Sequence, residues 1–236
     1  MMNLGGYISR LAYRGKTEHL INCHLQDIPS NGADTLHFKF VHTYIFPQMK
    51  SLYMRWQPTW KRGDDPTLKE MFDHPRKDFR EYKQQLYKDL IESYPNKEVL
   101  SVGNLENWIK LPFMEEKYMF TSTIIQVGLA IVFVILKSPF YELVFHHYIR
   151  PEAANEQQVF HDIYVSNYLP YVVSSILSNA EGGQVTNDMY LWESKTFARK
   201  SFLKVEMEGD TIMRDWLNWS TQFYQGCSRQ QEGLSF

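Results

Sequence analysis

The sequence predicts an α+β domain, and three patterns in it support this class. Residues 118–148 contain runs of β-branched side chains of strand length. Residues 67–94 and 156–195 carry apolar side chains at helical intervals. With 236 residues the chain is within the size that one hydrophobic core supports, so we expect a single domain over residues 1–236.

The first predicted elements lie on either side of a turn. Residues 18–25 alternate loosely and end at Asp27-Ile28-Pro29, which predicts a strand feeding a turn that opens a short helix. Residues 49–56 predict a second strand. Residues 67–94 predict an amphipathic helix or helix pair, interrupted near His74-Pro75 because proline breaks a helix.

The second half of the chain predicts strands and then helix. Strands are expected over residues 118–127, 129–136 and 141–148. Residues 156–195 are expected to be mostly helical, with breaks at Pro170 and Gly182-Gly183. The apolar face of this last segment predicts core packing or, if the fold encloses a cavity, part of its wall.

Composition excludes some classes of function. A formal charge of −2 and the lack of a basic block argue against nucleic acid as a partner. Two cysteines are too few for a disulfide framework, so we expect a reduced, intracellular setting. The longest apolar run, residues 124–136, is about half the length of a bilayer-spanning helix, which predicts core rather than a transmembrane segment.

The chemistry-bearing stretch is residues 31–42, with Asp34, His37 and His42. Neutral imidazole suits Fe, Zn or Cu, and two histidines with one carboxylate are the ligand set of non-haem Fe(II) oxygenases. On an ideal helix His37 and His42 lie about 140° apart, so a common metal requires a distorted turn or a helix end. The alternative is an ordinary helix start, with Asn31 or Asp34 as N-cap and both histidines at the surface.

Three blocks of sequence resemble the catalytic domain of Rieske-type oxygenases, specifically the Neverland-like cholesterol 7-desaturases. The first is GKTEHLINCHLQDIP, residues 15–29, continuing into NGAD at 31–34. The second is DMYLWESK, residues 188–195, which resembles the D-x-x-x-W-x-x-K block of that family. The third is DWLNWSTQFY, residues 215–224, which resembles R-R-W-x-x-Q-F-Y. The resemblance extends over roughly residues 15 to 225.

The resemblance implies a fold and a metal site. The fold is a helix-grip (Bet v1/START-like) antiparallel sheet around a long helix. His37, His42 and Asp188 would bind mononuclear Fe(2+). Asp34 would bridge electron transfer to a cluster histidine on a neighbouring subunit of a homotrimer. Asn31 would support the ligands from outside, although Ser30 stands where the family usually has an acid.

The implied activity is the conversion of cholesterol to 7-dehydrocholesterol with O2. Electrons would come from an NAD(P)H-dependent reductase through a Rieske [2Fe-2S] cluster. Candidate walls of the sterol site are Phe38, Phe40 and residues 124–136. The family also suggests membrane association, although no transmembrane segment is expected here.

The cluster ligands of that family are not in this chain. A Rieske cluster needs two thiolates and two imidazoles, which the family supplies as C-x-H and C-x-x-H pairs. Here Cys23 and His24 are adjacent, and Cys227 has no partner histidine. We therefore expect a catalytic domain without its Rieske domain. Two alternatives stay open, namely a non-catalytic sterol- or lipid-binding domain and a truncated gene model.

Overall fold

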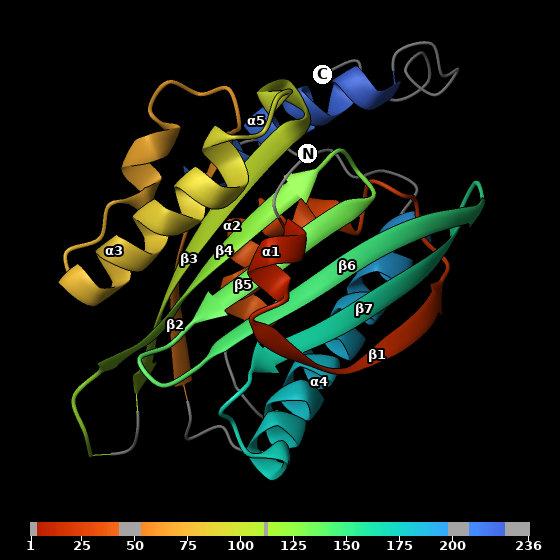
Figure 1. Ribbon diagram of the computed structural model, residues 1–236. Helices are drawn as coiled ribbons and strands as arrows, with labels where there is room; N and C mark the ends of the chain where they lie inside the picture. Colours follow the sequence, from red (N-terminus) through yellow and green to blue (C-terminus); the bar gives the residue numbers. More distant parts are fainter. Residues whose placement is uncertain (1–3, 43–52, 111–112, 198–207, 225–236) are drawn as a thin grey trace.

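A computed structural model describes residues 4–42, 53–110, 113–197 and 208–224 (Figure 1). Its centre is a seven-stranded antiparallel sheet in the order β1-β7-β6-β5-β4-β3-β2. Strands β2 to β7 form a meander, and β1 pairs with β7 at one edge. The strands are β1 (Leu11–Ile21), β2 (Tyr53–Arg62), β3 (Leu100–Lys110), β4 (Lys117–Val127), β5 (Ile131–Lys137), β6 (Glu142–Ala153) and β7 (Glu156–Ser166).

Helices lie on both faces of this sheet. Figure 1 shows α4 on the face opposite to α1 and α3. The helices are α1 (Leu4–Ile8), α2 (Thr35–Phe40), α3 (Lys77–Leu86), α4 (Tyr171–Phe197) and α5 (Glu208–Ser220). Short 3-10 turns occupy Pro29–Gly32, Leu68–Phe72, Lys97–Val99 and Thr221–Tyr224, and a π-helical turn occupies Tyr87–Glu92. The predicted α+β class is confirmed.

The meander strands form where β-branched side chains are densest. The predicted strands 118–127, 129–136 and 141–148 correspond to β4, β5 and β6. Gly128 has φ +59°, which glycine adopts at little cost, and it begins the tight connection from β4 to β5. Alternate residues of these strands face opposite sides of the sheet, so Ile125 packs towards α3 while Ile124 faces the other side.

The amphipathic segment 67–94 is confirmed as helical pieces interrupted near His74-Pro75. Its apolar side chains, including Leu86, Leu90 and Ile91, are buried against the sheet. Burying each such side chain contributes roughly 1.5–3 kcal/mol, which explains why a charge-rich helix stays docked.

Several predicted elements are wrong or shifted. Residues 156–166 form β7 rather than helix, because this segment pairs with β1 on one side and β6 on the other, and local sequence does not reveal that pairing. Gly182-Gly183 does not break α4, whereas Pro170 does precede it. Strand β3 was not predicted.

The first two strands are displaced from their predicted positions. The strand expected at 18–25 is β1, which begins earlier and ends at Ile21, where its ladder with β7 ends. The strand expected at 49–56 is β2, which runs from Tyr53 to Arg62, and residues 49–52 lie outside the described part of the chain. Local patterns marked these strands, but pairing with β7 and β3 set their limits.

A buried ion pair connects α3 to the sheet. Lys83 Nζ lies 2.5 Å from Glu106 Oε1, and the Lys83 side chain is 1% exposed. The Tyr118 hydroxyl donates to Glu106, and His74 Nε2 lies 3.4 Å from Glu106 Oε2. Burial by itself would raise the pKa of Glu106, but the charge and hydrogen bond of Lys83 outweigh it and hold this pKa below its usual range.

Glu106→Gln is therefore expected to lower the free energy of unfolding by about 3 kcal/mol at pH 7, because it leaves the Lys83 charge buried without a partner. A carboxylate with a depressed pKa stabilises the fold above its unfolded pKa of about 4.3, and this contribution is lost as pH falls through the folded pKa. The difference between the variant and the wild type should accordingly shrink in acid.

Urea denaturation between pH 3 and pH 8 measures this difference. Glu116→Gln is the control, because Glu116 pairs with Arg55 at an exposed position and its loss should cost much less. Equal losses for the two variants at pH 7, or a difference that does not depend on pH, would contradict the prediction.

Candidate metal centre

His37 and His42 lie at the two ends of the short helix α2. The Asp34 carboxylate caps this helix by accepting a hydrogen bond from the His37 backbone N–H at 3.0 Å. The helix ends at Phe40, with Val41 as C-cap, so His42 is the first residue beyond the cap. This helix end allows two imidazoles five residues apart to turn towards one point.

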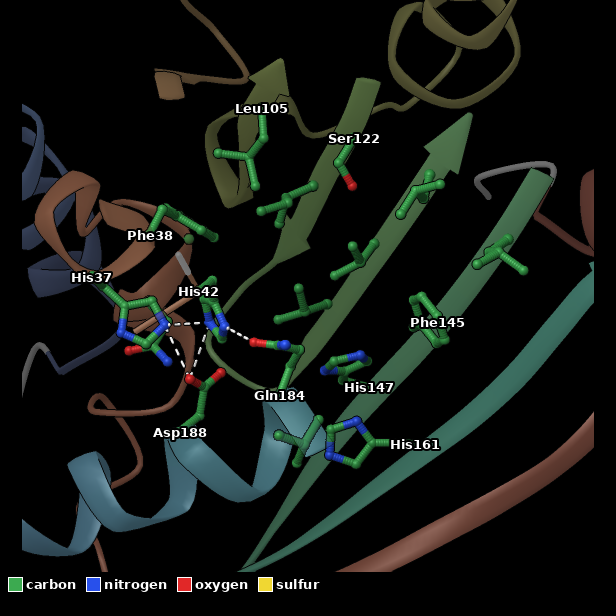
Figure 2. Close-up of a pocket in the computed structure, with 18 of the residues that line it drawn as sticks. His37, Phe38, His42, Leu105, Ser122, Phe145, His147, His161, Gln184 and Asp188 are labelled. Carbon is green, nitrogen blue, oxygen red and sulfur yellow. Dashed lines mark hydrogen bonds and ion pairs between the residues drawn. The ribbon is translucent and has the colours of Figure 1, made fainter. Parts of the chain in front are cut away.

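Asp188 reaches the same point from α4, 146 positions after His42. His37 Nε2 and His42 Nε2 are 2.7 Å apart. Asp188 Oδ1 lies 3.0 Å from the first nitrogen and 3.1 Å from the second. Figure 2 shows the two rings and the carboxylate directed at one another. The histidine side chains are buried, and that of Asp188 is 14% exposed.

The geometry of these three atoms fits a metal ion. Two donor atoms at right angles about 2.1 Å from one ion lie about 3.0 Å apart, which matches the two separations from Asp188 and is slightly longer than the 2.7 Å between the histidine nitrogens. Asp188 Oδ1 is buried and accepts no hydrogen bond that meets geometric criteria, which leaves it available to an ion. Burial opposes ionisation, but the close approach of the His37 and His42 rings holds the pKa of Asp188 below its usual value. Two imidazoles and a carboxylate form a ligand set suited to Fe(II).

The second ring nitrogens of the two histidines differ in their hydrogen bonding. His42 Nδ1 pairs with Gln184 Oε1, and Gln184 stands one helical turn before Asp188 on α4. Sequence analysis did not single out Gln184, although its spacing of four from Asp188 places both on one helix face. Within the described residues, His37 Nδ1 and the amide of Asn31 are buried without hydrogen-bond partners. Asn31 borders the cavity, and its expected support of the ligands stays a prediction.

A cavity opens beside the three ligand atoms. Its volume is about 240 Å³, measured as the space available to the centre of a water-sized sphere. By this measure one water needs about 10–15 Å³, so a far larger molecule can be accommodated. The wall is mostly apolar and includes Phe38, Leu105, Ile124, Val132, Val134, Phe145, Ile149 and Leu177.

Only some of the residues predicted to form the cavity wall can be placed there. Phe38 borders the cavity, as do several positions of 124–136. The side chain of Phe40 lies outside what the structure describes. Two histidines that sequence analysis did not identify, His147 on β6 and His161 on β7, also border the cavity. Both histidines are distant in sequence from the ligand residues, and no sequence motif indicated that they line the same cavity.

The comparisons with known proteins identify the family of the chain and agree with its fold. A family model described as the 3-ketosteroid 9α-hydroxylase C-terminal domain matches residues 9–224. Because the match covers most of the chain, the protein belongs to this family of Rieske oxygenase catalytic domains.

Its curated relatives bear the name that the resemblance suggested. Cholesterol 7-desaturase nvd of Xenopus laevis is 28% identical over 233 residues, covering 95% of this chain and 46% of the relative. Cholesterol 7-desaturase nvd 2 of Ciona intestinalis is 26% identical, covering 92% and 44%. The chain therefore spans about half the length of these relatives.

A solved structure supports the fold. NdmA from Pseudomonas putida CBB5, a QL mutant with theobromine, matches with a TM-score of 0.52 at 10% identity, covering 95% of this chain and 53% of that chain. At this identity the likeness concerns the fold alone. In the part of the chain that the structure describes, no helix is both long and apolar enough to cross a membrane.

Proposed function

We propose that this chain is the iron-binding, sterol-binding domain of an oxygenase of the cholesterol 7-desaturase type. The observation that carries the proposal is the meeting of His37, His42 and Asp188 at the wall of a large apolar cavity. The names of the relatives suggest the reaction, conversion of cholesterol to 7-dehydrocholesterol. In this proposal α4 closes over the sheet as the long helix of a helix-grip fold.

The residues of the chain have separate tasks in this proposal. His37, His42 and Asp188 hold Fe(II), which when bound supplies the activation of O2. Gln184 orients the His42 ring by accepting from Nδ1–H, a support that metal-bound histidines usually have. The apolar wall around Phe38 and Ile124 excludes water and holds an unactivated carbon of the sterol beside the ligands.

Electrons must come from outside these residues. The chain contains no C-x-H or C-x-x-H pair, so a Rieske [2Fe-2S] domain would be supplied by another polypeptide or another part of a longer protein. An NAD(P)H-dependent reductase would reduce that cluster. Asp34 would connect the His37 end of the site to a cluster histidine on a neighbouring subunit of a homotrimer.

Reconstitution tests the proposal. The Fe(II)-loaded chain, cholesterol, O2, reductase and NAD(P)H are combined with and without a separately supplied Rieske domain. We expect the conjugated-diene absorbance of 7-dehydrocholesterol only when the Rieske domain is present. Product without that domain would overturn the assigned electron route, and no product with it would overturn the assigned reaction.

The second candidate is a sterol- or lipid-binding domain without catalysis. The lack of cluster ligand pairs in the chain favours it, because binding needs only the cavity. The convergence of His37, His42 and Asp188 opposes this candidate, since a binding module has no need of three metal ligands. Iron content after purification distinguishes the two, because a pure binding domain has no reason to retain one iron per chain.

A further inference from the structure

A pair of imidazoles interrupts the apolar wall of the cavity. His147 on β6 and His161 on β7 are direct cross-strand partners, so their side chains share one face of the sheet. Their ring centroids are 4.0 Å apart. In the view of Figure 2 the pair faces α4, with Gln184 between it and His42.

Three of the four ring nitrogens of this pair have no hydrogen-bond partner within the described residues. His147 Nε2 and both ring nitrogens of His161 are buried without a hydrogen bond. Burial lowers the pKa of His147 well below its usual value and that of His161 to about 3, so both rings are neutral near pH 7. A neutral imidazole presents one N–H donor and one acceptor nitrogen, and leaving them unpaired in a buried position is unfavourable.

The neighbouring residue on β6, His146, is a histidine with a packing role. His146 is on the opposite face of β6, where its ring stacks on Phe133 at 4.5 Å and its Nδ1 lies 3.6 Å from an Asp162 carboxylate oxygen. His147 and His161 instead border the cavity together with Asp188. Packing therefore accounts for His146, whereas the cavity-facing pair has ring nitrogens that form no hydrogen bond with the described residues.

We propose that His147 and His161 bind the hydroxyl group of an otherwise apolar, alicyclic substrate. This inference rests on the proposed function and names the polar anchor of the same site. A hydroxyl donates one hydrogen bond and accepts another, which matches one acceptor nitrogen and one N–H of the pair. Because both rings are neutral, the anchor suits an alcohol better than a sulfate ester or a carboxylate.

Binding of two matched probes tests this anchor. Cholesterol and 5-cholestene, the same hydrocarbon without the hydroxyl, are titrated into the full iron-loaded chain while tryptophan fluorescence is followed, since Trp56 and Trp192 border the cavity. We expect the wild type to bind cholesterol about 5- to 100-fold more tightly than 5-cholestene, the range of two ordinary hydrogen bonds.

Variants then assign the preference to the pair. His147→Phe and His161→Phe should each weaken cholesterol binding by about 3- to 10-fold and leave 5-cholestene binding unchanged. His147→Gln keeps a polar group near the Nε2 position and should restore part of the preference. His146→Phe is the matched control from the outer face of the same strand, and it should keep the wild-type preference.

The outcomes separate this inference from the proposed function. Equal weakening of both probes in the His147 and His161 variants, or an undiminished preference in both, would overturn the anchor while sterol binding stands. Failure of the wild type to bind either probe would overturn both proposals. Iron content, measured on every variant, should stay at the wild-type level, and its loss in the Phe and Gln variants would show that the pair acts on the metal site instead.

Discussion

Replacing Asp188 with asparagine is expected to weaken Fe(II) binding by at least about 100-fold. Loss of a residue that merely supports a ligand costs 10–100-fold in metal affinity, and Asp188 is assigned the direct role. Asparagine keeps the shape of the side chain but removes the charge, and its amide oxygen is a poorer partner for the ion. His37→Ala should have an effect of the same order, because it removes another of the three clustered donor atoms.

Anaerobic Fe(II) titration, followed by metal analysis of the desalted protein, measures this loss. Glu193→Gln is the matched control, since Glu193 is an acid on the same helix but is not among the three clustered ligands. Circular dichroism should show that Asp188→Asn keeps its secondary structure. Iron retained by Asp188→Asn at wild-type affinity would remove Asp188 from the metal site.

Asp34 is expected to be required for turnover but not for iron binding. Its carboxylate caps α2, and the proposed function gives it a second task, the bridge from the Rieske cluster. Asp34→Ala removes both the cap and the charge, at a cost of about 1 kcal/mol for the cap. Asp34→Asn keeps a capping oxygen but cannot accept hydrogen bonds from two imidazole N–H groups as a carboxylate does.

We therefore expect both Asp34 variants to hold iron and to lose at least about 100-fold in product formation in the reconstituted system, since an interrupted electron route leaves the site unreduced. Single-turnover kinetics from a pre-reduced Rieske domain and iron analysis give the two measurements. If Asp34→Asn turns over like the wild type while Asp34→Ala does not, Asp34 is only a helix cap and the bridge lies elsewhere.

Sequence determined the parts of this protein that depend on local pattern. The spacing of apolar residues in 67–94 marked the helices that carry Leu86 and Leu90, because a helix must bury one face. The β-branched runs marked β4 and β5. The motif beginning at Asp188 nominated a ligand distant in sequence from His37, and the resemblance to the 7-desaturases identified the family.

Tertiary structure decided what depends on contacts between distant segments. Residues 156–166 were predicted as helix but form β7, because their conformation is set by pairing with β1 and β6, which the local pattern does not contain. His147 and His161 meet only because β6 and β7 pair in one register. Gln184 reaches His42 only because α4 and α2 lie on the same face of the sheet, beside one cavity. The sequence could nominate ligands one by one, but the cavity and its polar pair exist only once these segments pack together.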